Sequence, residues 1–344
     1  MEKKEYSAML DWILQPAFSV ADHQIEYANP AARGLAEPGT DVRSLLETGT
    51  EEYAAFQEGC LYLKLKLSGT SWGASVSRLD GRDIFLLEPE TDSSELQALA
   101  LASMELRQPL TNAMVSAERL TVAEDPMEFQ ARLNRGLHQI HRLLNNMSDV
   151  TYFASNTQMQ MLDLPKTFAE IFEKAQTLVA QTGRTLTYHG LSMDADGLAD
   201  RNQLERAVLC ILSNALKFTA GDGIIDASLT RRGDLLQLCI QDNGSGIPEE
   251  LLPHIFRRYL RQPAIEDGRQ GLGLGLVLVR TVALNHGGTV LIDKPGKTGT
   301  RITLTMKLRN GKGDRLRTPI EIPSGQDPGL IELSESLPHE LYRT

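Results

Sequence analysis

Two polar side chains with metal- and phosphate-binding chemistry lie three residues apart in the second half of the chain. Asn214 and Lys217 fall in the stretch 202–218, whose pattern predicts a helix, so they share one helical face. An amide oxygen suits Mg²⁺, which prefers oxygen ligands and keeps several waters. A lysine one turn away can meet phosphate oxygens as a point charge. The pair is therefore a candidate for binding a metal ion and a phosphate group.

Three glycine-containing motifs follow in order. The run Asp242-Asn-Gly-Ser-Gly246 comes after a predicted strand, where a buried carboxylate can accept a hydrogen bond from an adenine amino group and the glycines let the backbone approach the base. Gly271-Leu-Gly-Leu-Gly-Leu276 directly precedes a predicted helix, whose free N–H groups can bind phosphate. Gly299-Thr300 opens the last predicted strand. These motifs add an adenine contact and a phosphate loop to the candidate site.

Each motif alone has a common structural explanation. An isolated asparagine is usually a cap or a surface amide, and an Asp-Asn-Gly-Ser-Gly run is usually a hairpin turn. The glycine spacing in 271–276 is neither that of a P-loop nor that of the dinucleotide fingerprint. All four motifs in this order, with helices and strands between them, predict a nucleotide site.

The elements that must position these residues alternate between helical and strand patterns over 156–309. This alternation predicts an α/β sandwich, in which helices cover one face of a sheet. The predicted strands are 224–229, 235–241, 288–293 and 300–308, and the predicted helices are 202–218 and 272–285.

The same segment, over about 160–308, resembles the Bergerat-type ATP-binding domain of sensor histidine kinases. LSNALKFTA resembles the N box of that family, DNGSGIP the first glycine box, IFRRYLR the phenylalanine box, GLGLGLVLVR the second glycine box and GKTGTRITL the third. The resemblance implies Mg-ATP as the ligand, with Asn214 on the metal, Lys217 near phosphate and Asp242 on adenine. The other implied ATP-binding residues are Gly244, Gly246, Phe256, Arg261, Gly271, Gly273, Gly275, Gly299 and Thr300.

The resemblance also implies a lid and points to one departure. The lid would be 257–270, held at its base by Phe256, with Arg258 and Arg261 approaching the γ-phosphate. Related ATPases such as gyrase and Hsp90 place a water-activating glutamate four residues before the metal-binding asparagine, and histidine kinases usually have asparagine there. Here that position is Cys210, which departs from both patterns and bears on the affinity for the metal.

Residues 91–155 have the pattern of two long helices. Leu96, Ser103, Leu110 and Ala117 recur every seven residues, as do Leu99, Leu106, Ala113 and Leu120, and together they predict a seam with period 3.5. A return helix follows, with an apolar stripe from Phe129 to Val150. Because a two-helix hairpin cannot close a core alone, we expect a homodimer through 91–155 that forms a four-helix bundle.

The first bundle helix resembles the phosphoacceptor box of the same family. The family pattern Ser-His-Glu-Leu-Arg-Thr-Pro-Leu reads Ser-Met-Glu-Leu-Arg-Gln-Pro-Leu here, from Ser103 to Leu110. The resemblance places Met104 at the position of the histidine that attacks the γ-phosphate, Glu105 at the base and Gln108 at the threonine used in phosphatase work. A thioether has no proton to lose and forms no stable phosphoryl adduct, so self-phosphorylation at the usual site is predicted to be lost.

Two residue types near this box leave alternatives open. Met104 lies one step past the seam, which fits either a plain surface methionine or one that docks another protein. His138 and His141 lie off the apolar stripe of the return helix, so we expect both to be exposed. Either is a candidate substitute acceptor, although exposed polar residues on a bundle are common.

Residues 1–90 have a third pattern. Strands are predicted at 18–20, 25–27, 61–67, 72–79 and 83–87, and the alternation in 61–67 suits a strand with one face in water. The segment PAFSVADHQIEYANPAA resembles the opening of a PAS sensor domain. The predicted fold class is therefore α+β and multidomain: a PAS-like sensor at 1–90, a dimerisation hairpin at 91–155, an ATP-binding sandwich at 156–309 and a flexible tail at 310–344. Within the tail, 330–341 is a candidate short docking helix.

Composition excludes several classes. The chain has 344 residues with 35 Lys and Arg against 45 Asp and Glu, and a net charge of −10 argues against a dedicated nucleic-acid binder. Three widely separated cysteines without a Cys-x-x-Cys pair argue against a disulfide framework or a structural zinc site. No apolar run reaches the roughly 18–20 residues of a membrane span. We therefore expect a cytoplasmic protein.

These features predict a signalling protein of the histidine kinase family in a two-component-like pathway. It would bind Mg-ATP and couple a PAS signal to a partner, with self-phosphorylation lost but transfer to a histidine of a partner kinase retained. The alternative is a non-catalytic regulatory protein that binds a response regulator or a kinase and holds nucleotide as a structural ligand. A DNA-associated ATPase of the same fold is disfavoured by the acidic charge and by Cys210.

Overall fold

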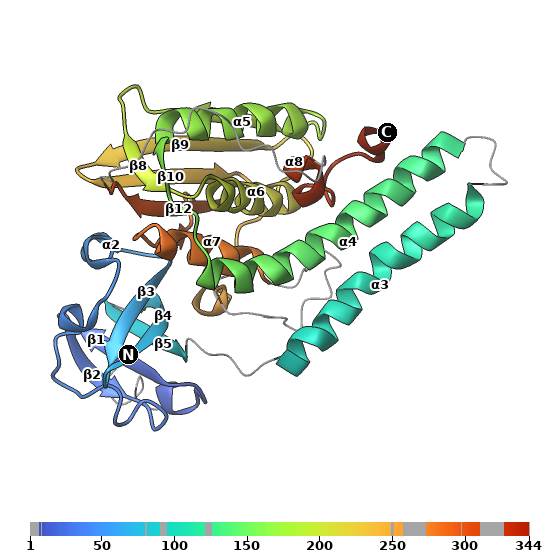
Figure 1. Cartoon of the computed structure of the whole chain (residues 1–344). Helices are drawn as coiled ribbons and strands as arrows, with labels where there is room; N and C mark the ends of the chain where they lie inside the picture. Colours follow the sequence, from blue (N-terminus) through green and yellow to red (C-terminus); the bar gives the residue numbers. More distant parts are fainter. Residues whose placement is uncertain are drawn as a thin grey trace.

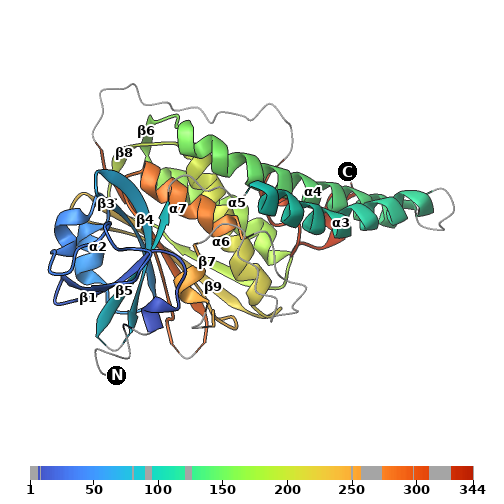
Figure 2. The ribbon, with the colours of Figure 1, turned by 90° about the horizontal axis from the view of Figure 1, so that it is seen from below.

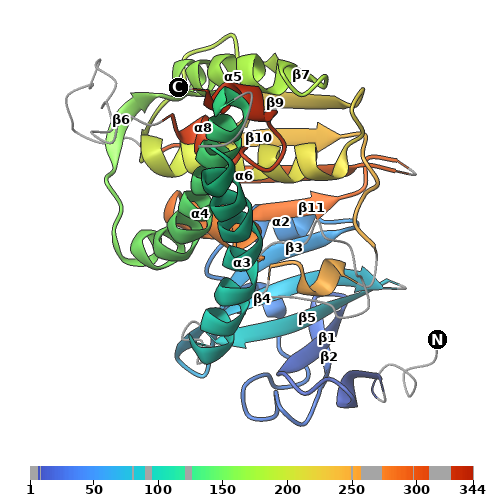
Figure 3. The same ribbon diagram turned by 90° about the vertical axis from the view of Figure 1, so that its right-hand side faces the viewer.

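Ten strands form one continuous sheet that runs through most of the molecule. The computed structural model describes residues 7, 9–79, 81–89, 95–120, 126–248, 251–256, 273–296, 298–309 and 327–343. Within them the strand order is β2-β1-β5-β4-β3-β11-β12-β10-β9-β7. The N-terminal strands lie at one end and the C-terminal strands at the other, with the two long helices beside the sheet (Figure 1 and Figure 3).

The N-terminal half of the sheet is antiparallel and confirms the predicted strands. Its five strands are β1 (Ala17–Ala21), β2 (Gln24–Ala28), β3 (Cys60–Leu67), β4 (Thr70–Leu79) and β5 (Arg82–Pro89). A 3₁₀ turn (Val42–Leu45) and α2 (Thr50–Ala55) connect β2 to β3. The leucines of β3, Leu61 to Leu67, point into the core of this half together with Phe18 and Phe85. These alternate positions are apolar because every second side chain of a strand faces the same side.

One expectation for β3 holds only in part. The other face of 61–67 was predicted to lie in water; Lys66 is exposed, but Tyr62 is buried, as is Cys60 just before it. Both belong to the core of the C-terminal half of the molecule, because β3 pairs antiparallel with β11 (Val290–Asp293). Tyr62 lies opposite Val290 and Cys60 opposite Ile292. The sheets of the two halves are thereby joined edge to edge.

The C-terminal half is an α/β sandwich, as predicted. Its strands in the large sheet are β7 (Thr185–His189), β9 (Ile224–Arg232), β10 (Leu235–Asp242), β11 and β12 (Thr300–Lys307), while β6 (Gln160–Asp163) and β8 (Asp196–Ala199) form a small separate sheet. Three helices, α5 (Leu164–Ala180), α6 (Arg201–Phe218) and α7 (Gly275–Asn285), cover one face (Figure 1). Asp163 caps α5 and Asp200 caps α6, each accepting from backbone N–H groups of the first turn.

A buried histidine joins the two helices that carry the candidate ligand-binding residues. His286 follows α7; its Nδ1 lies 2.7 Å from the Val282 carbonyl oxygen, and its Nε2 accepts from the Asp200 N–H at 3.0 Å. A carbonyl can only accept, so Nδ1 carries the proton and the ring is neutral. Burial lowers the pKa of His286 below its ordinary value. The end of α7 is thus fixed to the start of α6.

The hairpin of α3 (Glu95–Arg119) and α4 (Pro126–Ser155) projects beyond the rest of the molecule (Figure 2). One predicted row of the seam faces α4, with Ala113 buried and Leu106 partly buried. The other row is exposed at Ser103, Leu110 and Ala117, so the predicted seam is divided between two faces of α3. None of the described helices combines the length and apolarity of a membrane span.

The expected flexible tail is wrong for residues 327–343, which we call the C-terminal strap. The strap contains α8 (Pro328–Glu332) and a 3₁₀ turn (His339–Tyr342), and it lies between α4 and α6 (Figure 1). Leu333, Leu337 and Tyr342 are buried, so apolar burial holds the segment in place. The predicted docking helix at 330–341 overlaps the strap, whereas 310–326 lie outside the described residues.

The joint between the two halves predicts a specific effect of Gly59→Ala. A Cβ at this position would lie 2.1 Å from the Ile292 carbonyl oxygen, and φ is +93°. Gly69→Ala is the matched control, because φ is +84° there and no atom lies within 4 Å of the added Cβ. The left-handed backbone costs about 1–2 kcal/mol in either variant. In denaturant unfolding, we expect the free energy of unfolding to fall about 1–3 kcal/mol further in Gly59→Ala than in Gly69→Ala. Equal losses in the two variants would contradict the close packing of Gly59 against β11.

The environment of His286 predicts a pH dependence of stability. Its native pKa is lowered, so its contribution is complete above the unfolded value of about 6.5 and is lost as pH falls below it. We expect the free energy of unfolding to fall by up to about 1.4 kcal/mol per pH unit in this range. In His286→Gln, which has no titrating group here, this part of the slope should vanish. Stability is measured by denaturant unfolding from pH 7.5 to 5.5. If its slope against pH is the same in His286→Gln as in wild type, His286 is not the source of the pH dependence.

Candidate functional site

Asp242 ends β10 as a buried carboxylate held by backbone N–H groups. Asp242 is only 8% exposed. Its Oδ1 accepts hydrogen bonds from the N–H of Gly244 at 2.8 Å and from the N–H of Thr300 at 3.3 Å. Burial raises the pKa of Asp242, an effect that the two hydrogen bonds oppose. Oδ2 makes neither of these bonds. The arrangement suits a carboxylate that accepts a hydrogen bond from a polar ligand.

The loop that leads into β12 requires glycine at position 299. The φ angle is +92°, and a Cβ would lie 2.3 Å from the Asp242 carbonyl oxygen. The Gly299 N–H donates to the Gly244 carbonyl at 2.9 Å, which brings Thr300 onto the Asp242 carboxylate. Gly246 also has a positive φ, +76°, beside Gly299. The predicted first and third glycine motifs therefore form one turn around Asp242.

Asn214 lies on α6 and faces the beginning of α7. A Cβ on Gly275 would lie 3.9 Å from Asn214 Nδ2 and 4.0 Å from Cys210 Cβ. The N-terminus of α7 has Leu274 at its cap, and no side chain among the described residues caps it. First-turn N–H groups of a helix beside an amide side chain suit an anion. Gly273, with φ of +67°, precedes this turn.

Lys217 is one turn further along α6 and is not free. Its Nζ lies 3.5 Å from Glu335 Oε2 of the strap. Burial lowers the pKa of Lys217, while the charges of Glu335 and, more weakly, Glu105 raise it. Sequence reasoning identified the lysine but missed Glu335, because the two residues are 118 positions apart and nothing in the tail pattern pairs them.

Cys210 occupies a polar environment that its neighbours on α6 do not predict. The thiol is buried, and Sγ lies 3.6 Å from Glu332 Oε1 of the strap. Burial raises the pKa of Cys210 well above its ordinary value, and the Glu332 charge adds to the effect. The residue is therefore a neutral thiol. Histidine kinases usually have asparagine at the position of Cys210. Here the thiol contacts the Glu332 carboxylate instead.

The base of the predicted lid contacts the N-terminal half of the molecule. Phe256 is fully buried, and its ring packs edge to face on Tyr62 of β3 with centroids 5.6 Å apart. Arg280 of α7 donates to the Phe256 carbonyl at 2.7 Å and to Glu88 of β5 at 2.8 Å, and its guanidinium lies 4.4 Å from the Tyr62 ring centroid. These contacts were not predicted. The lid itself, with Arg258 and Arg261, lies outside the described residues, and so does the adjacent Gly271 of the second glycine motif.

The residues of the phosphoacceptor-like box, 103–110, lie in the middle of α3. Met104 is 54% exposed, Gln108 is exposed and Glu105 is half-buried. The charge of Glu105 raises the pKa of Lys217, so these two side chains are within electrostatic range of each other.

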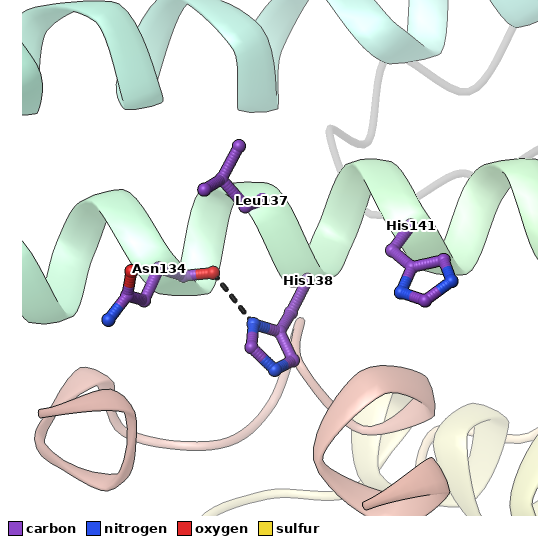
Figure 4. A pocket seen from close by; sticks show the side chains of 4 residues that line it. All are labelled: Asn134, Leu137, His138 and His141. Carbon is purple, nitrogen blue, oxygen red and sulfur yellow. Dashed lines mark hydrogen bonds between the residues drawn. The ribbon is translucent and has the colours of Figure 1, made fainter. Parts of the chain in front are cut away.

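His138 and His141 are half-buried on α4, contrary to the expectation that both are exposed. With Asn134 and Leu137 they line a pocket of about 250 Å³ (Figure 4). His138 Nδ1 lies 2.8 Å from the Asn134 carbonyl oxygen, and the ring packs on Tyr342 of the strap. His138 therefore packs on the strap, while the hypothesis of a substitute acceptor stays a prediction.

The assembled residues fit a nucleotide and a divalent cation. Asp242, Gly244, Gly246, Gly299 and Thr300 form one end of the site, and Asn214 lies beside the free N-terminus of α7 at the other. A buried acceptor for an adenine amino group, an amide oxygen for Mg²⁺ and helical N–H groups for phosphate are the chemistry that Mg-ATP requires.

Comparison with known proteins agrees with this geometry. Residues 199–310 match the family model described as histidine kinase-, DNA gyrase B-, and HSP90-like ATPase. The adaptive-response sensory kinase SasA of Synechococcus sp. is 31% identical over 237 residues, 66% of this chain and 61% of that protein. The sensor histidine kinase CusS of Escherichia coli is 29% identical over 210 residues, 59% of this chain and 43% of that protein.

Among solved structures, that of histidine kinase ThkA in complex with response regulator protein TrrA has 15% sequence identity and a TM-score of 0.48, covering 88% of this chain and 98% of that one. The chain spans less than two thirds of the length of either curated relative. The matched region nevertheless includes the site and extends beyond the ATPase model. Sequence motifs, geometry and relatives agree that residues 199–310 form an ATPase domain of the histidine kinase-, DNA gyrase B-, and HSP90-like family, in a chain that is similar to sensor histidine kinases.

Proposed function

We propose that residues 156–309 bind Mg-ATP in the site between α6, α7 and the loops around Asp242. In this proposal Asp242 accepts from the adenine amino group, Asn214 ligates Mg²⁺ and Lys217 meets phosphate oxygens. Gly273 and Gly275, together with Gly271, lie under the phosphates. The observation that carries the proposal is the buried Asp242 carboxylate, fixed by the N–H groups of Gly244 and Thr300.

We further propose that the protein couples a signal from a PAS-like sensor at 1–90 to a partner. The sensor is joined to the ATP-binding domain through β3 and β11, and Arg280 connects Glu88 of the sensor to the residue before the lid. A change in the sensor sheet can thus reach the base of the lid without passing through the helices.

A homodimer through 91–155 is supported by the apolar side chains that α3 and α4 leave exposed. Leu110 and Met114 on α3 and Leu137 and Leu144 on α4 are each about half exposed or more. Two hairpins that bury these faces against each other form a four-helix bundle.

The proposed activity is transfer of the γ-phosphoryl group to a histidine of a partner kinase rather than to this chain. Met104 offers no nucleophile, although Glu105 remains beside it and within electrostatic range of Lys217. A response regulator is the proposed downstream partner. The residues proposed to bind ATP are retained, which favours turnover over a purely structural site.

A second candidate function is a non-catalytic regulatory protein in which nucleotide is a structural ligand. It is favoured by the contacts of Cys210 with Glu332 and of Lys217 with Glu335, since both side chains are engaged by the strap. An acceptor histidine supplied in trans separates the two. Transfer from ATP supports the kinase, whereas nucleotide binding without transfer supports the regulatory protein.

Asp242→Ala tests the adenine contact. Loss of a buried carboxylate that pairs with the base should weaken Mg-ATP binding by about 1–3 kcal/mol, roughly five- to 150-fold. Isothermal titration measures the change. Asp226→Ala on the neighbouring strand is the matched control, because this aspartate is exposed. Equal affinity in Asp242→Ala and Asp226→Ala would refute the assignment.

Met104→His tests whether only the acceptor is missing. If the remaining residues are competent, incubation with labelled Mg-ATP should give acid-labile, base-stable label on α3. Wild type treated in the same way should carry none at this position. Label on α3 of wild type would overturn the claim that the acceptor is lost, and a Met104→His variant that binds ATP without labelling would favour the regulatory alternative.

A further inference from the structure

The C-terminal strap is built into the interface between α4 and α6. Arg135 of α4 donates to the carbonyl oxygens of Ser334 at 2.9 Å and Glu335 at 2.8 Å, and Asn134 donates to that of Tyr342 at 2.9 Å. Backbone groups of the strap are thus bound by side chains of the bundle helix. The position of Glu335 is fixed by these bonds.

Two strap carboxylates point into a group of cations between the helices. Glu332 is only 2% exposed and pairs with Arg206 of α6 at 2.7 Å. Glu335 pairs with Arg142 of α4 and, through Oε2, with Lys217 of α6 at 3.5 Å. Burial alone would raise the pKa of Glu335, but the charges of Arg142 and Lys217 lower it below its ordinary value. The carboxylate is therefore an anion bound by two cations.

Arg142 and Lys217 both contact the Glu335 carboxylate, so together they form an anion site between α4 and α6. Arg142 is 7% exposed, its Nη1 donates to Ser213 at 3.3 Å, and its Nε has no hydrogen-bond partner within the part of the chain that the structure describes. A buried guanidinium with a free donor requires a compensating anion. A carboxylate oxygen and a phosphate oxygen satisfy that requirement equally well.

The anion site lies at the phosphate end of the proposed nucleotide pocket. Lys217 is on the same helix as Asn214, three residues away, and the strap also contacts Cys210 one turn earlier. We propose that the strap is an intramolecular competitor of the nucleotide: Glu335 occupies, on Lys217 and Arg142, the position that terminal phosphate oxygens of Mg-ATP take. This inference rests on the proposed ATP site and assigns Arg142 of the bundle helix to it.

The competition couples nucleotide to the arrangement of the domains. The strap bonds to α4 on one side and to α6 on the other, so its displacement removes contacts that hold the hairpin against the ATP-binding domain. Coupling of this kind is reciprocal: nucleotide releases the strap to the same extent that the strap weakens nucleotide binding. The strap therefore acts as a restraint that ATP lifts.

Glu335→Gln tests the competition in the full chain. Glutamine keeps the size of the side chain and removes its charge, so Mg-ATP affinity by isothermal titration should rise about fivefold or more. Glu340→Gln is the matched control: it removes a strap carboxylate whose side chain is 52% exposed and lies 3.5 Å from His339 Nδ1. Its affinity should equal that of wild type.

Hydrogen exchange supplies a measurement that needs no variant. In wild type, saturating Mg-ATP should speed backbone exchange in peptides covering 327–343, whereas exchange in the sensor strands should not rise. Suppose that wild type binds ATP, that Glu335→Gln binds it no more tightly, and that ATP leaves exchange in the strap unchanged. The strap is then only a structural clamp, so the inference fails while the proposed function stands. If wild type and both variants all fail to bind, the proposed function fails and the inference with it.

Discussion

The turn around Asp242 is the constraint on which the candidate site depends. A carboxylate buried at the end of β10 needs hydrogen-bond donors, and it takes them from the N–H groups of Gly244 and Thr300. Thr300 can reach it only because residue 299 is a glycine in the left-handed region. The same turn fixes the ends of β10 and β12 relative to α6, where Asn214 faces α7. The local chemistry and the layer architecture are therefore set together.

Around that site, contacts between distant segments connect the three parts of the molecule. The N-terminal sheet continues into the C-terminal half through β3 and β11, and Arg280 bridges Glu88 to Phe256. The strap joins α4 to α6 through Glu332 and Glu335. The N-terminal sheet and the long hairpin therefore contact the half of the molecule that carries the candidate site through separate groups of residues.

The sequence predicted what depends on local pattern and missed what depends on distant pairing. Alternation in 61–67 and the glycine motifs at 242–246 and 299–300 identified strands and turns, because side-chain period and positive φ are local properties. The burial of Tyr62 was not predictable, since its cover comes from Phe256, nearly two hundred residues later. The strap was predicted to be flexible because its Pro- and Gly-rich approach resembles a linker, although the apolar spacing of Leu330, Leu333 and Leu337 hinted at docking.

The central claim is that the buried carboxylate of Asp242 selects adenine. Titration of the full chain with Mg-ATP and with Mg-GTP tests it most directly, because guanine presents a carbonyl oxygen where adenine presents an amino group, and a carboxylate cannot donate to it. The account predicts that ATP binds about tenfold or more tightly than GTP. Equal affinity for the two nucleotides, or the absence of binding to either, would contradict it.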